Sequence, residues 1–154
     1  MRTIKKVAIF IDGFGGMTQG LFATLIIGTM IQQIGLLIGG STGNVIYLLG
    51  KAAAALTSAG IGVGVAVKYG ESPLVTVSAA VAAMVGGYAS KITGGTFFVD
   101  GNAVLAGPGE PLGAFIAAFA GITCGHLVSG KTKVDIIVTP VITIGAGSVV
   151  GLLV

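Results

Sequence analysis

Long apolar stretches, separated by short polar or glycine-rich breaks, occupy almost the whole chain. A helix that spans the hydrocarbon core of a bilayer needs about 20 mostly apolar residues. The stretches that approach this length are residues 18–39, 45–67, 73–90, 112–129 and 135–154. The pattern therefore predicts an all-α integral membrane protein with a single membrane domain, residues 1–154, and about five transmembrane helices.

Two segments depart from this pattern. Residues 3–15 place apolar side chains at helical spacing behind a basic start, which predicts an N-terminal amphipathic helix in the membrane interface, with a frayed terminus as the alternative. Residues 92–111 contain too many glycines and prolines for a full span and too many apolar residues for an ordinary solvated loop. Irregular backbone is tolerated at membrane depth where protein or a water-filled cavity surrounds it. We predict a re-entrant segment there, the alternative being a loop that caps the outer face.

Composition strengthens the membrane assignment. The chain is 54% hydrophobic and only 8% charged, whereas soluble domains carry about 25% charged residues. Its 28 glycines suit close helix packing in a membrane. The single cysteine, Cys124, allows no disulfide framework and is expected to be a small buried hydrophobe. No catalytic triad, metal-ligand cluster or nucleic-acid-binding surface is visible, so we expect no cofactor, no metal and no nucleic-acid partner.

The basic residues indicate an orientation. If the N-terminus is cytoplasmic and residues 92–111 return to the side that they left, six basic residues are cytoplasmic and two are outside. The six are Arg2, Lys5, Lys6, Lys68, Lys131 and Lys133, and the two are Lys51 and Lys91. This distribution obeys the positive-inside rule, whereas a full crossing of residues 92–111 would give four against four. We therefore predict a multi-pass protein of the cell membrane with a cytoplasmic N-terminus.

One motif matches a nucleotide-binding pattern, but its surroundings do not suit nucleotide binding. Residues 125–132, GHLVSGKT, match the G-x-x-x-x-G-K-[ST] pattern of a phosphate-binding P-loop. That site needs a soluble strand, loop and helix, whereas this stretch ends an apolar span. We interpret it as a cytoplasmic turn with positive-inside lysines, and expect no nucleotide. Residues 60–64, GIGVG, are similarly interpreted as helix packing and not as dinucleotide binding.

A few polar residues remain as candidates for ligand binding. Acidic residues within membrane segments are costly and are functional hypotheses by default. Glu110 follows a Gly-Pro-Gly run and precedes Pro111, so its carboxylate could face a cavity, although it could instead cap the next helix. His126 near the end of the fourth span is a candidate with interfacial packing as the alternative. The candidate substrate-binding residues are Glu110, Asn102, Asp100 and His126.

The run Gly107-Pro108-Gly109-Glu110-Pro111-Leu112 resembles the Gly-x-x-Glu-Pro element of the membrane (IIC) components of phosphotransferase-system sugar transporters. Residues 130–140 and 12–17 also look like a divergent bacterial branch of these proteins. The resemblance implies that Glu110 binds sugar hydroxyls in a re-entrant region and that separate cytoplasmic components donate the phosphoryl group. Such proteins are about twice as long, so the chain is expected to be an N-terminal half.

The sequence thus leads to two functional hypotheses. The first is an IIC-like subunit of the bacterial plasma membrane that binds and translocates a sugar or polyol and is coupled to phosphorylation by cytoplasmic partners. The alternative is a small membrane channel or regulatory scaffold without enzymatic activity. A homo-oligomer is expected, and in the channel or scaffold alternative the copies would pack through their glycine and alanine faces.

Overall fold

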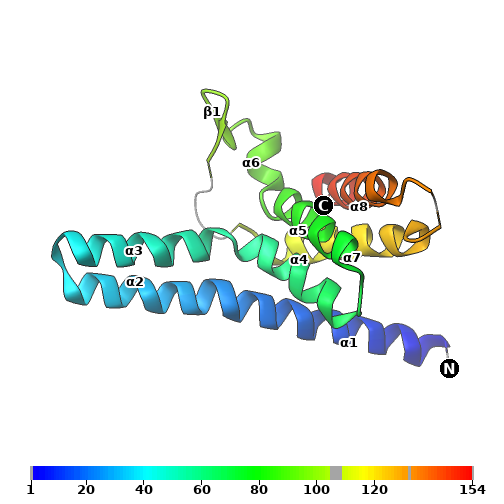
Figure 1. Cartoon of the computed structure of the whole chain (residues 1–154), viewed down its shortest axis with the longest axis horizontal. Coiled ribbons are helices and arrows are strands. Elements are labelled where there is room, and N and C mark those ends of the chain that lie inside the picture. The colour runs from blue at the N-terminus through cyan, green and yellow to red at the C-terminus, as the bar shows by residue number, and fades with distance from the viewer. Residues whose placement is uncertain (1, 105–108, 132, 154) are drawn as a thin grey trace.

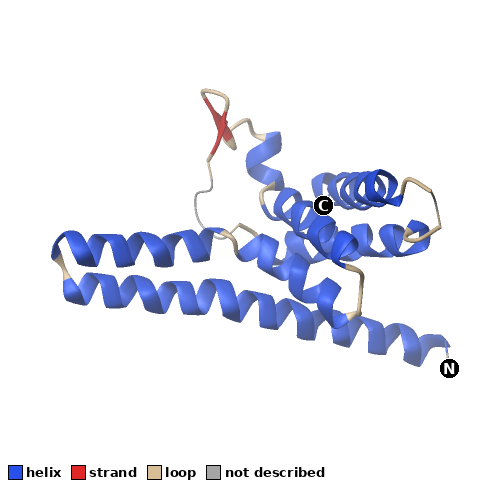
Figure 2. Cartoon of the chain, viewed as in Figure 1, coloured by secondary structure: helices blue, strands red, loops and turns tan. Residues whose placement is uncertain are grey.

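The structure, a computed structural model, describes residues 2–104, 109–131 and 133–153, apart from the side chains of residues 2–8 and 10. Helices make up nearly all of it, and one short β-hairpin stands off the helical body (Figure 2). The elements are α1 (Arg2–Leu21), the π-helical turn η1 (Phe22–Ile26), α2 (Ile27–Ile38), α3 (Gly40–Ala55), α4 (Thr57–Lys68), α5 (Pro73–Gly87), α6 (Ala89–Thr93), β1 (Phe98–Val99), β2 (Asn102–Ala103), α7 (Pro111–Val128) and α8 (Asp135–Leu153). The predicted all-α membrane class is confirmed.

The number of spans differs from the five expected. Among the described residues, three helical stretches are long and apolar enough to cross a membrane, Ile11–Ile38, α7 and α8. The predicted span 45–67 corresponds to the pair α3 and α4, which together are long and apolar enough for a fourth span but are bent by 53° at their junction. The predicted span 73–90 is divided as well, because α5 ends after 15 residues and α6 follows it. Two of the five apolar stretches are therefore interrupted helices.

The N-terminal half of the chain begins with one continuous helical path. Residues 3–15 and 18–39 were expected to form two separate elements, but α1, η1 and α2 follow one another without a break (Figure 1). Glycines normally weaken helices, yet here Gly16 and Gly20 face α4, and packing supplies the stability that local propensity lacks. The location of residues 3–15 in the interface stays a prediction.

Glycines on α1 and α4 allow the two backbones to touch. A Cβ on Gly16 would lie 2.5 Å from the carbonyl oxygen of Gly64 and 2.8 Å from the Cα of Val65. Gly20 faces Gly60 in the same way, so each helix contributes two glycines four residues apart. This is the small-xxx-small packing of membrane helices. The interpretation of residues 60–64 as a packing motif is confirmed.

A compact body forms where α4, α5, α7 and α8 pack together. Its core contains few large side chains, chiefly Ile61, Val65, Val75 and Phe115, set among many buried alanines. The ring of Phe14 on α1 stacks on Phe115, with ring centroids 4.7 Å apart. Since alanine and glycine add little volume, the helix axes can approach closely and the body stays small.

The helices α2 and α3 form an antiparallel arm that extends away from this body (Figure 1). The turn between them is Gly39-Gly40, where both residues have positive φ angles of 68° and 69°. Glycine is the residue that adopts this conformation without strain. The two helices contact each other through facing glycines seven residues apart on each: Gly28, Gly35, Gly43 and Gly50.

Two contacts show which helix ends lie together. The Tyr69 hydroxyl, just after α4, donates a hydrogen bond to the carbonyl of Ile9 on α1 at 2.6 Å. His126, in the last turn of α7, contacts Glu71 in the α4–α5 turn at 3.0 Å. The start of α1 and the ends of α4 and α7 therefore share one end of the body. The hairpin, between α6 and α7, lies toward the other end. This arrangement agrees with the basic residues that were assigned to one side.

We predict that cysteines introduced at Lys68 and Lys131 react with a membrane-impermeant reagent from the cytoplasmic side, and one at Lys91 from the outside. The helix ends described above bring Lys68 and Lys131 to the same end of the body. Labelling of intact cells and inverted vesicles measures this directly. Labelling of Lys68 and Lys131 from opposite sides would contradict the topology.

A second prediction concerns the contact between α1 and α4. Gly16→Ala adds a methyl group against the backbone of Gly64, and overpacking of this kind costs about 1–3 kcal/mol. Gly145→Ala is the matched control, because no described atom lies within 4 Å of its added Cβ and alanine favours helix by up to about 1 kcal/mol. Thermal unfolding in detergent should show a lower Tm for Gly16→Ala than for the unmodified protein, and no such decrease for Gly145→Ala. Equal Tm values for the two variants would show that the close contact is unimportant.

Candidate functional site

Three interruptions of the helical chain meet at one place in the body. The first is Leu56, between α3 and α4, and the second is Tyr88, between α5 and α6, both with ψ angles that leave the helix (12° and 18°). The third is Glu110, which precedes α7 with extended backbone. Membrane transporters build their substrate sites at such discontinuous helices, because these expose backbone dipoles and polar groups.

Side chains satisfy the carbonyl groups that the first interruption releases. The buried Tyr88 hydroxyl donates to the carbonyl of Ala55 at 3.3 Å. The buried Thr57 hydroxyl donates to the carbonyl of Ala54 at 2.6 Å. Unpaired backbone groups cost several kcal/mol in an apolar environment. These bonds therefore stabilise the bend and tie the first two interruptions together.

The third interruption is held by the backbone of Glu110 itself. Its N–H donates to the carbonyl of Gly87 at 2.8 Å. The preceding Gly109 has φ +77°, and a Cβ there would lie 2.7 Å from Ser58 Oγ and 3.0 Å from the carbonyl oxygen of Gly87. Both the conformation and the space therefore require glycine at position 109. The close contact at Gly109 and the Glu110 N–H bond together hold the backbone from which the Glu110 side chain extends.

The Glu110 carboxylate does not cap the helix that it precedes. Although Glu110 occupies the N-cap position of α7, its side chain makes no capping hydrogen bond in the described structure. The residue is exposed, and its carboxylate lies above Gly113, whose added Cβ would be 3.9 Å from Oε2. The capping alternative that was left open by the sequence therefore finds no support, and the carboxylate is available to a ligand.

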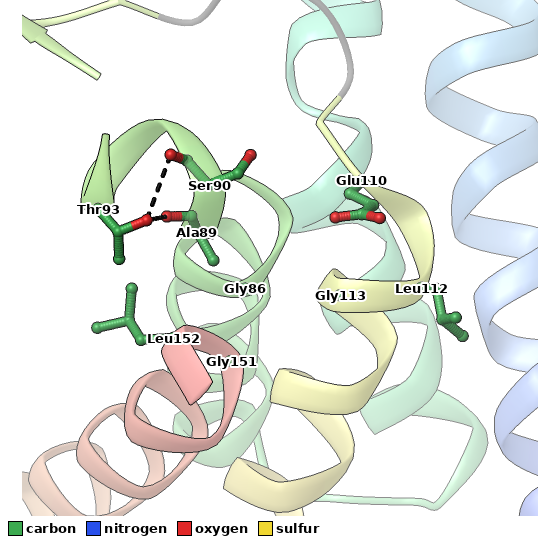
Figure 3. A pocket seen from close by; sticks show the side chains of 9 residues that line it. All are labelled: Gly86, Ala89, Ser90, Thr93, Glu110, Leu112, Gly113, Gly151 and Leu152. Carbon is green, nitrogen blue, oxygen red and sulfur yellow. Dashed lines mark hydrogen bonds between the residues drawn. The ribbon is translucent and has the colours of Figure 1, made fainter. Parts of the chain in front are cut away.

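A cavity of about 280 Å³ lies beside this carboxylate, between α6, α7 and the end of α8 (Figure 3). Its polar side chains are Glu110, Ser90 and Thr93. The Thr93 hydroxyl donates to the carbonyls of Ala89 at 3.0 Å and Ser90 at 3.3 Å, so its oxygen keeps free lone pairs toward the cavity. The remaining lining residues are Gly86, Ala89, Leu112, Gly113, Gly151 and Leu152.

Ser90 and Thr93 were not proposed as site residues from the sequence. Both come from α6, a short helix that the predicted span 73–90 and the following segment did not anticipate. Two hydroxyl residues three positions apart share one helix face. This spacing, shortly after Gly86-Gly87, is the sequence pattern that could have indicated them as site residues.

Asp100 and Asn102, two of the predicted site residues, do not line the cavity. They lie in the β-hairpin, where Phe98 pairs with Ala103 and Val99 with Asn102. Asp100 and Gly101 both have positive φ, 53° and 79°, as the two central residues of a type I′ turn require. Asp-Gly is a strong sequence signal for this turn. The described part of residues 92–111 consists of the end of α6, this hairpin, the loop residues that flank it and the start of α7. Residues 105–108 of that segment, including Gly107 and Pro108, lie outside the described residues.

His126, the fourth predicted site residue, is at the opposite end of α7. The two positions are 16 residues apart in the sequence, so a continuous helix separates Glu110 and His126 by about 24 Å. His126 instead contacts Glu71 through Nδ1. The structure therefore does not bring the four predicted residues together, and of these only Glu110 lines the cavity.

The P-loop-like stretch also has a structural explanation. The Gly130 N–H, which would face a phosphate, donates to Asp135 Oδ1 at 2.9 Å. The same oxygen accepts the Thr139 hydroxyl at 2.5 Å. The stretch begins within the last turn of α7 and does not follow a strand, and Thr132 lies outside the described residues. The arrangement supports the interpretation as a turn that joins two spans.

Comparison with protein families gives one match. The family described as "Phosphotransferase system, EIIC" matches residues 11–154. Comparisons with curated proteins and with solved structures gave no match. The matched region includes every element that lines the cavity, from α5 to α8.

We predict that Gly109→Ala lowers the Tm more than Gly70→Ala does. Both glycines have positive φ, +77° and +71°, so alanine meets a similar conformational cost at each position, about 1 kcal/mol. Only at Gly109 does the added methyl group also collide with Ser58 and Gly87, since no described atom lies within 4 Å at Gly70. Thermal unfolding of both variants measures the difference. A Tm loss at Gly70 as large as at Gly109 would show that the contact does not hold Glu110.

Proposed function

Because the chain belongs to the EIIC family of the phosphotransferase system, the membrane components of sugar uptake, we propose that the cavity beside Glu110 binds the transported sugar or polyol. The observation that carries this proposal is the Glu110 carboxylate. The backbone of Glu110 is held by a hydrogen bond and by a required glycine, and its carboxylate makes no capping bond in the described structure and borders a cavity with two hydroxyl groups.

The chemistry of the cavity suits a polyhydroxylated ligand. A carboxylate accepts hydrogen bonds from two neighbouring hydroxyl groups, and hydrogen bonds to charged groups contribute about 1.5–3 kcal/mol each. Ser90 and Thr93 add hydroxyl oxygens on the facing helix. Ligand pockets start at about 300 Å³, so a cavity of about 280 Å³ favours a monosaccharide or small polyol over a larger sugar.

The location of the cavity bears on the direction of transport. Glu110 begins α7, whereas the basic residues Lys68 and Lys131 lie near the ends of α4 and α7. With the N-terminus in the cytoplasm of a bacterial cell, the cavity lies in the outer half of the body. A sugar bound there would have to move along α7 before a cytoplasmic phosphoryl donor could reach its hydroxyl. Coupling to such a donor, from separate components, is part of this proposal.

The scaffold alternative loses the feature that motivated it. The glycine faces expected to join different copies of the chain are used within it, as at Gly16 with Gly64 and Gly28 with Gly50. The exposed side chains of the α2–α3 arm are mainly large and apolar, including Leu36, Leu37 and Leu49, and lipid can cover them. A homo-oligomer therefore stays a prediction.

We predict that Glu110→Gln weakens sugar binding about tenfold or more, which corresponds to about 1.4 kcal/mol, because it keeps the shape and removes the charge. Asp100→Asn is the matched control, since Asp100 is exposed on the hairpin and asparagine also suits its turn. Calorimetric titration of the purified protein with a panel of monosaccharides and polyols measures both. The Tm without ligand should stay the same in each variant. Equal losses of binding in the two variants would contradict the assignment of Glu110.

A further inference from the structure

A second cavity, of about 370 Å³, lies at the other end of the body. It is an open cavity lined by residues of α1, the turn between α4 and α5, and the last turns of α7. Two aromatic rings line it, Tyr69 and Phe119, with centroids 6.4 Å apart and planes at 65°. Ile9 and Ile122 contribute apolar surface. It shares no residue with the cavity beside Glu110.

A carboxylate with few partners lies in this cavity. The Glu71 side chain is only 8% exposed, and its two oxygens lie 3.0 and 3.1 Å from Nδ1 of His126. An ionised carboxylate has no proton, so Nδ1–H donates this bond. The carboxylate can accept about four hydrogen bonds, and the histidine supplies one N–H. A buried charge is costly unless it is paired. Since His126 fills only one of the acceptor positions of Glu71, the remaining positions are available to a ligand that donates hydrogen bonds.

Like the Glu71 carboxylate, the two hydroxyl groups that line this cavity can only accept hydrogen bonds from a ligand. The Tyr69 proton is committed to the Ile9 carbonyl at 2.6 Å, and the Thr123 proton to the Phe119 carbonyl at 2.8 Å. Burial raises the pKa of Tyr69 above its ordinary value, and the negative charge of Asp12 raises this pKa further. Tyr69 therefore keeps its proton, and its oxygen, which lies against Ile9 and Gly13 of α1, can act toward a ligand only as an acceptor. Thr123 likewise presents lone pairs.

This balance selects the class of ligand. A phosphate would need hydrogen-bond donors in the cavity, and a sugar would need both donors and acceptors. The described lining instead offers hydroxyl acceptors, a buried carboxylate and two aromatic rings, with His126 as its side-chain donor. A primary ammonium group has three N–H donors and a positive charge, which rings also attract. We propose that this cavity binds a primary ammonium group, supplied in the membrane by the headgroup of an ethanolamine phospholipid.

The surroundings favour a lipid as the source of the ammonium. Ile9 and Ile11 of α1 are exposed, at 45% and 64%, so acyl chains next to the cavity would cover apolar surface. Lys68 ends α4 directly before Tyr69, and lysines of membrane helices lie near the headgroups. A free amine would fill the acceptors but would leave this apolar surface bare.

The test compares ethanolamine and choline phospholipids, since choline has the same charge and no N–H donor. The purified full chain is placed in nanodiscs of either lipid with the same share of phosphatidylglycerol, and lipid binding is also titrated in detergent by native mass spectrometry. We expect a higher Tm in the ethanolamine lipid and binding about tenfold tighter than for the choline lipid. Glu71→Gln should remove this preference, and Asp100→Asn, on the distant hairpin, should keep it.

The variants separate recognition from folding. Thr123→Val alters an exposed residue and removes one acceptor, so it should reduce the preference in a chain that folds normally. Equal Tm and equal binding in the two lipids, or a preference that persists in Glu71→Gln, would overturn the proposal. Protection by free ethanolamine without any effect of lipid type would overturn the lipid headgroup as the occupant.

Discussion

The structure depends on helix backbones that touch each other directly through glycine. In a bilayer, lipid chains are as apolar as the side chains, so the hydrophobic effect does little to join one helix to another, and close packing must supply the attraction. Gly16 lies against Gly64, and Gly86 lies against Gly113. Each contact leaves no room for a methyl group. The same close approach brings α5 and α7 near enough for the Glu110 N–H to reach the carbonyl of Gly87, so the packing of the helices and the position of the candidate site have one cause.

Interrupted helices are the second requirement of this site. A continuous helix uses all of its own backbone groups, whereas the ends at Leu56 and Tyr88 expose carbonyls and the start of α7 exposes N–H groups. Tyr88 satisfies the carbonyl of Ala55 from the neighbouring helix pair, so one interruption stabilises another. The result is a polar location inside an apolar body that keeps its backbone bonds. Glu110 is the charged residue that this arrangement presents to the cavity.

Much of the fold could be predicted from the sequence, because apolar length is a strong signal: α7 and α8 lie almost where residues 112–129 and 135–154 were expected. Helix interruptions were harder, since the alanine- and glycine-rich stretch around Leu56 has no proline and only the weakly polar Thr57 and Ser58 beside it, and the bend depends on tertiary contacts. Glu110 could be found because a carboxylate beside Gly and Pro stands out in an apolar chain. Ser90 was much harder to find, because its spacing from Thr93 is a weak signal where hydroxyl groups are common in membrane helices, and only packing against α8 gives it a cavity.

The central claim is that the sugar binds between α6 and α7 beside Glu110. Photo-crosslinking of the purified protein with a diazirine-bearing sugar, competed by the unmodified sugar, tests the location without relying on any variant. Peptide mapping should show competed labels on residues that line this cavity, such as Ser90, Thr93 and Leu112. Competed labels confined to the opposite cavity, at Tyr69 or His126, would contradict the account.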